Sequence, residues 1–310
     1  MTLVDSFGRK ASSLRIALTP RCSLNCTYCH HEGEVSPEKE MPAEVVVKIA
    51  RAAAELGFKS IKFTGGEPLQ RTDLEEIISK MPDLDISLTT NGIYLEKRAK
   101  SLAAAGLDRV NISLDSLDPE IYKSITGCRD GDLDKVLRGI DAAIEAGLKP
   151  IKLNVVVLKE NEKGIKDLIE FCKKKGLILQ LIELLDVEHA KVAGDIEGIE
   201  RDLQARAERV EIREMQRRKK YYVDGAEIEV VRPMDNTEFC ANCTRLRVTS
   251  DGNLKPCLLR NDNLINITKC DVEEMKDLLR LANRRRTPYF TRGRSVEVGS
   301  NTSNSGASGR

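Results

Sequence analysis

A repeated order of strand, helix and glycine runs from Leu14 to about Leu184 and limits the possible folds more than any other feature of the sequence. Six apolar runs have the length and composition of strands, and they alternate with segments of helical period, such as Val46, Ile49 and Ala53. The six predicted strands are Leu14–Leu18, Ser60–Phe63, Ile86–Thr90, Val110–Leu114, Ile151–Leu158 and Ile178–Leu184.

Glycine follows several of the predicted helices. Gly57, Gly106, Gly147 and Gly176 each stand where a helix is expected to end, because glycine accepts the left-handed conformation of a helix C-cap. The repeated order is typical of right-handed βαβ units and predicts a parallel sheet. Six units are two short of a closed eight-fold barrel, so we expect an α/β fold with a partial (β/α)6 TIM-like barrel. Its ligands should bind beyond the C-terminal ends of the strands.

The sequence divides into four predicted regions: the barrel over 1–186, a charged helical linker over 187–222, a smaller C-terminal module over 223–290 and a loose tail over 291–310. In the linker, Ile196, Ile199 and Leu203 recur at helical spacing among charged residues. The module contains short strand-like runs, Ile228–Val231 and Leu246–Thr249. The tail is rich in glycine, serine, asparagine and arginine.

Composition restricts the classes of function. With 41% hydrophobic and 32% charged residues the chain should fold as a soluble protein. No apolar run reaches the roughly 20 residues of a membrane span, and residues 1–10 do not resemble a signal peptide, so we expect a cytoplasmic protein without membrane contact. The net charge of +1 argues against a nucleic-acid binder. An anionic substrate would therefore need local arginines and lysines.

Nine cysteines are present, and six of them form two groups of three. The first group, Cys22, Cys26 and Cys29, forms C-x3-C-x2-C directly after the first predicted strand. Three thiolates from one loop can hold a [4Fe-4S] cluster and leave one iron open for an outside ligand. A zinc site would need a fourth ligand. His30 or His31 could serve, although either would be crowded so close to Cys29.

The first group, with the aromatic Tyr28 before its last cysteine, resembles the radical S-adenosylmethionine (SAM) superfamily. Three further motifs at successive strand ends support this resemblance: Gly65-Gly66-Glu67-Pro68, Thr89-Thr90-Asn91-Gly92 and Asn111-Ile112-Ser113-Leu114-Asp115. The resemblance implies that SAM binds the open iron and that an electron from the cluster cleaves it to a 5′-deoxyadenosyl radical. The two glycines would let the backbone approach the cofactor, and Glu67 would supply a negative partner nearby.

The second group, Cys240, Cys243 and Cys257, forms C-x2-C-x13-C. Cys270 could supply a fourth thiolate, and a zinc knuckle is an open alternative. Arg245 and Arg247 stand two and four residues after Cys243, so in an extended segment they face the same way. Two guanidinium groups beside an open iron would suit an anionic, hydrogen-bonding substrate.

The two cysteine groups together closely resemble the GTP 3′,8-cyclase family, from about Leu14 to Phe290. This resemblance implies two [4Fe-4S] clusters and SAM as cofactors, with GTP as substrate. The product would be (8S)-3′,8-cyclo-7,8-dihydroguanosine 5′-triphosphate, formed by a carbon–carbon lyase in the first step of molybdenum cofactor biosynthesis. It also implies an electron donor and transfer of the product to cyclic pyranopterin monophosphate synthase. The oligomeric state stays open, and a homodimer is one alternative.

The resemblance assigns roles to residues at matching motif positions. Arg245 and Arg247 are implied to act in catalysis and in substrate binding. The other implied substrate contacts are Arg15, Lys62, Thr89 and Lys152. The implied cofactor contacts are Tyr28, Gly65, Gly66, Glu67, Ser113 and Leu185.

The chain also departs from the family pattern. Gln180 stands on the sixth strand where many members have arginine, and Leu185 stands where many have methionine. The chain ends in Gly309-Arg310 rather than Gly-Gly. Two readings of the tail stay open: it supplies Arg292 or Arg294 to the site instead, or it is partly non-native. Two alternatives stay open: another radical SAM enzyme with an auxiliary cluster, of the peptide-maturase type, and a non-enzymatic iron–sulfur or zinc module.

Overall fold

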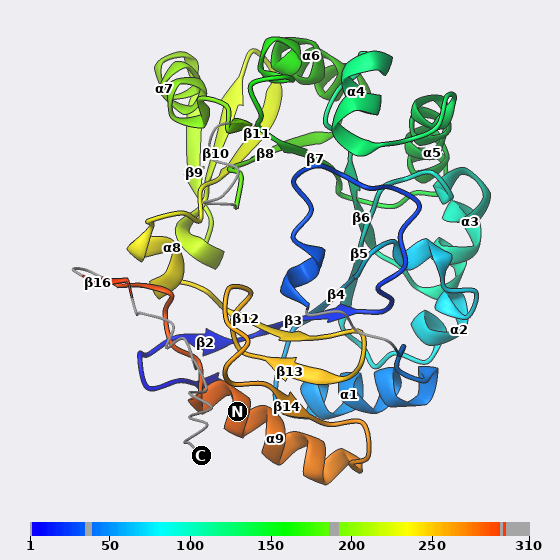
Figure 1. Cartoon of the computed structure of the whole chain (residues 1–310), viewed down its shortest axis with the longest axis vertical. Helices are drawn as coiled ribbons and strands as arrows, with labels where there is room; N and C mark the ends of the chain where they lie inside the picture. The colour runs from blue at the N-terminus through cyan, green and yellow to red at the C-terminus, as the bar shows by residue number, and fades with distance from the viewer. Residues whose placement is uncertain (1, 35–38, 186–191, 292–293, 296–310) are drawn as a thin grey trace, which may run out of the picture.

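A single curved sheet of twelve strands organises the molecule (Figure 1). The computed structural model describes residues 2–34, 39–185, 192–291 and 294–295. Six parallel strands, adjacent in chain order, form the centre of the sheet, and this confirms the predicted partial barrel. They are β3 (Ser13–Ala17), β4 (Ser60–Thr64), β5 (Asp85–Thr90), β6 (Arg109–Ser113), β7 (Ile151–Val156) and β8 (Ile178–Ile182).

Helices cover the outer face of this sheet (Figure 1). In α1 the apolar residues Val46, Ile49, Ala50 and Ala53 are all buried, as their spacing predicted. α3 and α6 end at Gly106 and Gly176 in the left-handed conformation. The helices around the barrel are α1 (Ala43–Glu55), α2 (Leu74–Ser79), α3 (Leu95–Ala105), α4 (Pro119–Thr126), α5 (Asp132–Glu145) and α6 (Ile165–Lys175).

Strands from the C-terminal part extend both edges of the barrel sheet. β12 (Arg245–Val248) pairs in parallel with β3, and β11 (Ala226–Val231) pairs in parallel with β8. The outer strands are antiparallel: β13 (Asn253–Lys255) and β14 (Ile265–Asn266) follow β12, whereas β10 (Lys219–Val223) and β9 (Arg209–Ile212) follow β11. The C-terminal segments therefore continue the sheet instead of forming a separate layer.

The segment 187–222 is more than a helical linker. Its helix α7 (Ile196–Arg206) is followed by β9, by the short turn η5 (Met215–Arg217) and by β10. Part of the predicted linker is thus sheet, because β9 pairs with β10 and β10 pairs with β11. Residues 187–191 lie outside the described residues, as do Arg292 and the tail 296–310.

The N-terminal hairpin and the last helix, α9, lie on the same side of the barrel (Figure 1). The hairpin of β1 (Leu3–Val4) and β2 (Lys10–Ala11) contacts α9 (Val272–Arg284), which also packs against α1. One continuous apolar core includes residues of the barrel and of the C-terminal strands. The remaining α-helix is α8 (Thr237–Ala241), and the remaining strands are β15 (Phe290–Thr291) and β16 (Arg294–Ser295). Among the described residues, no helix is long and apolar enough to span a membrane.

Candidate active site

A cavity of about 600 Å³ opens inside the barrel. Its lining runs along the parallel strands, from first residues such as Ser13 and Ser60 to the loops at their C-terminal ends, and includes residues of the C-terminal segments. All six grouped cysteines line it, and all six are free thiols. The cavity thus joins two groups that are more than 200 residues apart in the sequence. Among the other predicted residues it is lined by Arg15, Tyr28, Lys62, Gly65, Gly66, Thr89, Ser113, Lys152, Leu185, Arg245 and Arg247.

The first cysteine loop follows β3 and is tied down by its backbone. The amide of Cys29 donates to the carbonyl of Cys26 at 3.1 Å, which closes the C-x2-C turn. The Tyr28 hydroxyl donates to Asp115 at the end of β6 at 2.6 Å. Burial raises the pKa of all three thiols. Thiols with a raised pKa gain from metal coordination, because a bound metal compensates the thiolate charge.

Gly65 and Gly66 are needed because their backbone packs against the cysteine loop. A Cβ on Gly66 would lie 2.3 Å from the Arg21 carbonyl oxygen, and one on Gly65 would lie 2.4 Å from that of Thr19. The amide of Gly66 also donates to the Thr19 carbonyl at 2.7 Å. The two glycines therefore fix the loop that carries the cysteines, a reason that the sequence pattern did not reveal.

Glu67 differs from its predicted role. It is fully buried and is absent from the residues that line the cavity. Its carboxylate accepts hydrogen bonds from the hydroxyl of Thr90 and the amide of Asn91, both at 2.7 Å, and from the amide of Leu69 at 2.8 Å. Glu67 thus joins the glycine loop to the end of β5 from within the protein.

The second cysteine group also lines the cavity. Cys240 lies in α8, Cys243 just before β12, and Cys257 after β13. The amide of Cys243 donates to the carbonyl of Cys240 at 3.3 Å. Burial acts to raise the pKa of Cys243, but the positive charges of Arg286, Arg245 and Arg9 outweigh it and lower the pKa.

Cys270 is not part of this group, because it lies next to the start of α9 and does not line the cavity. The alternative of Cys270 as a fourth ligand therefore has no support from the geometry. Cys172 is fully buried in α6 and does not line the cavity either.

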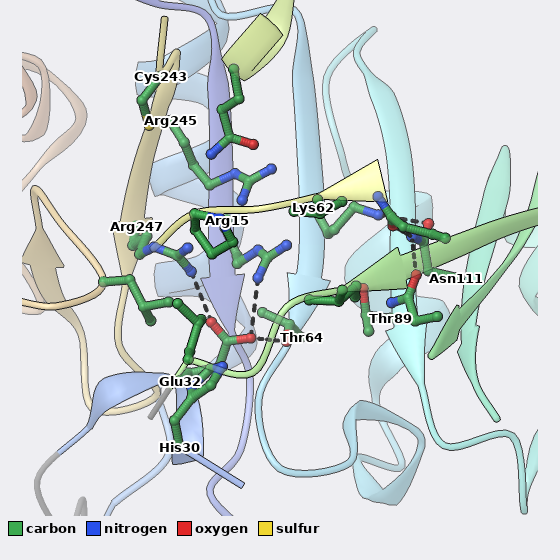
Figure 2. Close-up of a pocket in the computed structure, with 18 of the residues that line it drawn as sticks. Arg15, His30, Glu32, Lys62, Thr64, Thr89, Asn111, Cys243, Arg245 and Arg247 are labelled. Atoms are coloured by element: carbon green, nitrogen blue, oxygen red, sulfur yellow. Dashed lines mark hydrogen bonds and ion pairs between the residues drawn. The ribbon is translucent and has the colours of Figure 1, made fainter. Parts of the chain in front are cut away.

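Strand register places three cations side by side in the wall of the cavity. Arg247 of β12 is the direct neighbour of Arg15 of β3, which is in turn the neighbour of Lys62 of β4. Neighbouring positions in parallel strands point to the same face of the sheet, so the three side chains form a row (Figure 2).

Glu32 was not predicted, yet it lies against this row. Its carboxylate binds Arg247 at 2.9 Å and Arg15 at 3.3 Å, and it accepts from the Thr64 hydroxyl at 2.7 Å (Figure 2). Burial acts to raise the pKa of Glu32, but Arg15 and Arg247 outweigh it and hold the pKa at about 2. The carboxylate is therefore charged and neutralises part of the row.

Two cations of the wall contact no carboxylate within the described residues. The Lys62 ammonium donates to the Asn111 side chain at 2.8 Å, and burial lowers its pKa. The Arg245 guanidinium contacts only the Met215 sulfur, at 3.4 Å, and its buried Nε has no partner. Unpaired buried cations carry a desolvation cost that an anionic ligand would offset.

A second carboxylate that was not predicted, Glu229 of β11, pairs with cations of the opposite wall. It pairs with Lys152, with Arg218 at 2.8 Å and with Arg213 at 3.4 Å, and it accepts from Gln180 at 3.3 Å. All three cations line the cavity, so cations outnumber carboxylates here as well. Arg213 and Arg218 supply positive charge next to Gln180, where the sixth strand itself has none.

The six thiols fit iron–sulfur clusters better than mononuclear zinc. Within the described part of the chain, no three His, Cys, Asp or Glu side chains converge closely enough to hold one metal ion. A structural zinc ion needs four converging ligands, whereas a cubane cluster takes thiolates at its separate irons. Each group brings three free, solvent-accessible thiols to one cavity, and this matches the second requirement.

Comparison with known proteins gives the class of this fold and site. The Radical SAM superfamily model matches residues 16–172, and the Molybdenum Cofactor Synthesis C model matches residues 177–291. The structure of Streptococcus suis SuiB bound to S-adenosylmethionine superposes with a TM-score of 0.68 at 20% identity, over 89% of this chain and 68% of that chain. Native anSMEcpe with bound AdoMet superposes with a TM-score of 0.57 at 21% identity, over 92% and 84%. The class defined here is a radical SAM protein.

Comparison with sequence relatives identifies the family within this class. A probable GTP 3′,8-cyclase of Methanosarcina mazei is 53% identical over 301 residues, which cover 93% of this chain and 90% of the relative. One of Methanothermobacter thermautotrophicus is 48% identical over 306 residues, which cover 94% of this chain and 100% of the relative. The chain therefore belongs to the GTP 3′,8-cyclase family of radical SAM proteins.

Proposed function

We propose that this protein converts GTP into (8S)-3′,8-cyclo-7,8-dihydroguanosine 5′-triphosphate, the first step of molybdenum cofactor biosynthesis. Membership of the GTP 3′,8-cyclase family supports this proposal. The observation that carries it is the shared cavity, which is lined by both cysteine groups and by a row of cations. A cofactor held at the first group and a nucleotide held at the second would therefore lie in the same cavity.

In this proposal Cys22, Cys26 and Cys29 hold the first [4Fe-4S] cluster, which with SAM supplies the radical that takes a hydrogen atom from the substrate. The hydrogen bond of Tyr28 to Asp115 fixes the loop, and Gly66 holds it against the end of β4. The side chains of Ser113 and Leu185 and the backbone of Gly65 and Gly66 line the space left for the cofactor.

Cys240, Cys243 and Cys257 would hold a second cluster with an open iron for the guanine base. Arg245 lies two residues from Cys243 and has an unpartnered buried donor, so it is suited to hydrogen-bond a nucleotide at that iron. Arg247 reaches from the same strand toward Glu32 and the cation row. These two arginines would orient the substrate and compensate its charge.

The triphosphate would occupy the cation-lined wall. Lys62 and Arg15 are neighbours in this wall, and Lys152 extends it across the barrel with Arg213 and Arg218. Thr89, at the end of β5, adds a hydroxyl on the same face. Guanidinium and ammonium groups bind phosphate through charge-assisted hydrogen bonds, which also exclude water from the reacting ribose. An external electron donor and transfer of the product to cyclic pyranopterin monophosphate synthase belong to the same proposal.

An anaerobic assay of the reconstituted protein with SAM, dithionite and GTP tests the proposal. We expect 5′-deoxyadenosine and a GTP-derived pterin to form together, with about eight irons per chain, as two cubane clusters require. If 5′-deoxyadenosine forms but no GTP product appears, the substrate is wrong although the class is right. If about four irons are bound, the second cluster is wrong.

Two variants separate the proposed roles. Cys26→Ala should abolish SAM cleavage, because the first cluster loses a ligand. Arg245→Ala should keep uncoupled cleavage but lower cyclisation at least about a hundredfold, since it removes a group that orients the substrate. Arg201→Ala, on the exposed face of α7, is the matched control and should behave as wild type. Normal cyclisation by Arg245→Ala would contradict its role.

A further inference from the structure

Two buried arginines from opposite ends of the chain meet behind the second cysteine group. Arg9 belongs to the N-terminal hairpin, and Arg286 follows α9. Arg9 is 7% exposed and Arg286 is 1% exposed. They are joined directly, because Arg286 Nη1 donates to the Arg9 carbonyl oxygen at 3.3 Å.

Both arginines hold the backbone of the C-x2-C turn. Arg9 Nη1 donates to the carbonyl oxygen of Cys240 at 3.2 Å, and Arg286 Nη2 donates to the carbonyl oxygen of Cys243. These two carbonyls belong to two of the three cysteines in the group. The orientation of their thiols is therefore coupled to the two guanidinium groups.

Within the described part of the chain, one carboxylate pairs with the two arginines. Asp5 is the carboxylate that both arginines share: Arg9 Nε lies 2.8 Å and Arg286 Nη1 lies 3.5 Å from its Oδ2. Two buried cations thus face one carboxylate. Arg9 Nη2 and Arg286 Nε are buried donors with no partner within the described residues. Buried donors normally have acceptors, so each arginine keeps a donor for a further acceptor at this position.

We propose that Arg9 and Arg286 are positioning residues that orient the second cysteine group and raise the reduction potential of the cluster bound there. The inference rests on the second cluster of the proposed function. The thiolates of this group and the sulfurs of a cluster bound there would supply acceptors for these donors. Positive charge in a buried site stabilises the reduced, more negative cluster more than the oxidised one. Neither residue needs to touch the substrate for this effect.

The test uses protein in which Cys22, Cys26 and Cys29 are all alanine, so that the only remaining cluster is the second one. Its reduction potential is measured by an equilibrium redox titration followed by electron paramagnetic resonance. Loss of iron to a ferrous chelator is followed in parallel. Arg285→Gln, an exposed neighbour, is the matched control, and Arg286→Lys is the conservative variant.

Arg9→Gln and Arg286→Gln should each make the potential more negative and speed iron loss severalfold, whereas Arg286→Lys should retain much of the wild-type potential. Asp5→Asn removes the shared carboxylate and should shift the potential in the opposite direction. Opposite signs distinguish a charge effect from general damage to the fold, which would weaken the cluster in every variant. The proposal is overturned if the potential is unchanged in all of these variants while iron remains bound. If the triple alanine protein binds no iron although the wild type binds about four, the second cluster itself is refuted and this inference fails with it.

Discussion

Glu32 shows how a single carboxylate can set the strength of an anion site. It shares Arg15 and Arg247, so a phosphate that binds these arginines has to share them with Glu32 or replace it. His31 and Glu32 also have left-handed backbone conformations, which are uncommon for residues other than glycine. The residue therefore holds a strained backbone position directly beside the proposed substrate.

Glu32→Gln should tighten GTP binding, because it removes a competing negative charge and keeps a group that can accept from Thr64. We expect the Kd for GTP to fall about tenfold, which corresponds to about 1.4 kcal/mol. Equilibrium binding of labelled GTP to the anaerobic protein measures this change. Weaker binding by the variant would mean that Glu32 itself holds the nucleotide.

The charge of Lys152 should make GTP binding depend on pH. Burial lowers the pKa of this ammonium to about 8, although Glu229 acts to raise it. Lysine is cationic below its pKa, so the wall loses a positive charge as pH rises through 8, and GTP affinity should fall about threefold to tenfold between pH 7 and pH 9. Lys152→Arg stays charged over this range and should remove the dependence. An unchanged profile in Lys152→Arg would assign the effect to another group.

At the scale of elements, the site depends on loops that are held by neighbouring strand ends. The cysteine loop after β3 packs against the glycine loop after β4, which Glu67 joins to the end of β5. Three successive strand ends are thereby fixed relative to each other. A cluster bound by the first group gains a rigid support in this way.

Gly66→Ala should disrupt this support. The new Cβ would lie 2.3 Å and 2.6 Å from the carbonyl oxygens of Arg21 and Pro20, so the cysteine loop would have to move. We expect iron content to fall from about eight to about four per chain, with the second cluster retained. Gly164→Ala is the matched control, because a Cβ there meets nothing within 4 Å. Full iron content in Gly66→Ala would show that the loop tolerates the shift.

At the scale of the whole molecule, the C-terminal segments complete the barrel rather than sit beside it. β12 and β11 extend opposite edges of the barrel sheet. The short turn η5 also contacts α8, and the amide of Gln216 in η5 donates to the carbonyl of Asn242, directly after α8, at 2.9 Å. The cavity is closed by residues from both parts. Neither part could form the site alone.

The protein without clusters should therefore unfold in one cooperative transition. Leu153 in the barrel and Leu246 in β12 are both fully buried in the same core, so truncating either to alanine should cost about 2–5 kcal/mol. We expect both variants to lower the denaturant concentration at the midpoint of this one transition. Circular dichroism and tyrosine fluorescence in denaturant should give the same midpoint. Two separate transitions, each shifted by only one variant, would contradict a common cooperative unit.

Sequence periodicity and spacing were sufficient for the barrel and for the cysteine groups. Strands and helices follow from local patterns of apolar residues, and three cysteines within eight positions must lie in one loop. The residues at strand ends could be assigned to one face because parallel strands share their C-terminal edge. These features depend on neighbours along the chain, which the sequence displays directly.

Only the tertiary structure revealed which charges meet. Lys152 and Glu229 are 77 positions apart, and Arg9 and Arg286 are 277 positions apart, yet each pair is in direct contact. The pairing of β8 with β11 creates the first contact, and the packing of the N-terminal hairpin against the region of α9 creates the second. The local periodicity of apolar residues predicts neither contact. The balance of charge around the two cysteine groups was therefore decided by long-range strand pairing and packing, because electrostatic energy depends on distance in space and not on distance along the chain.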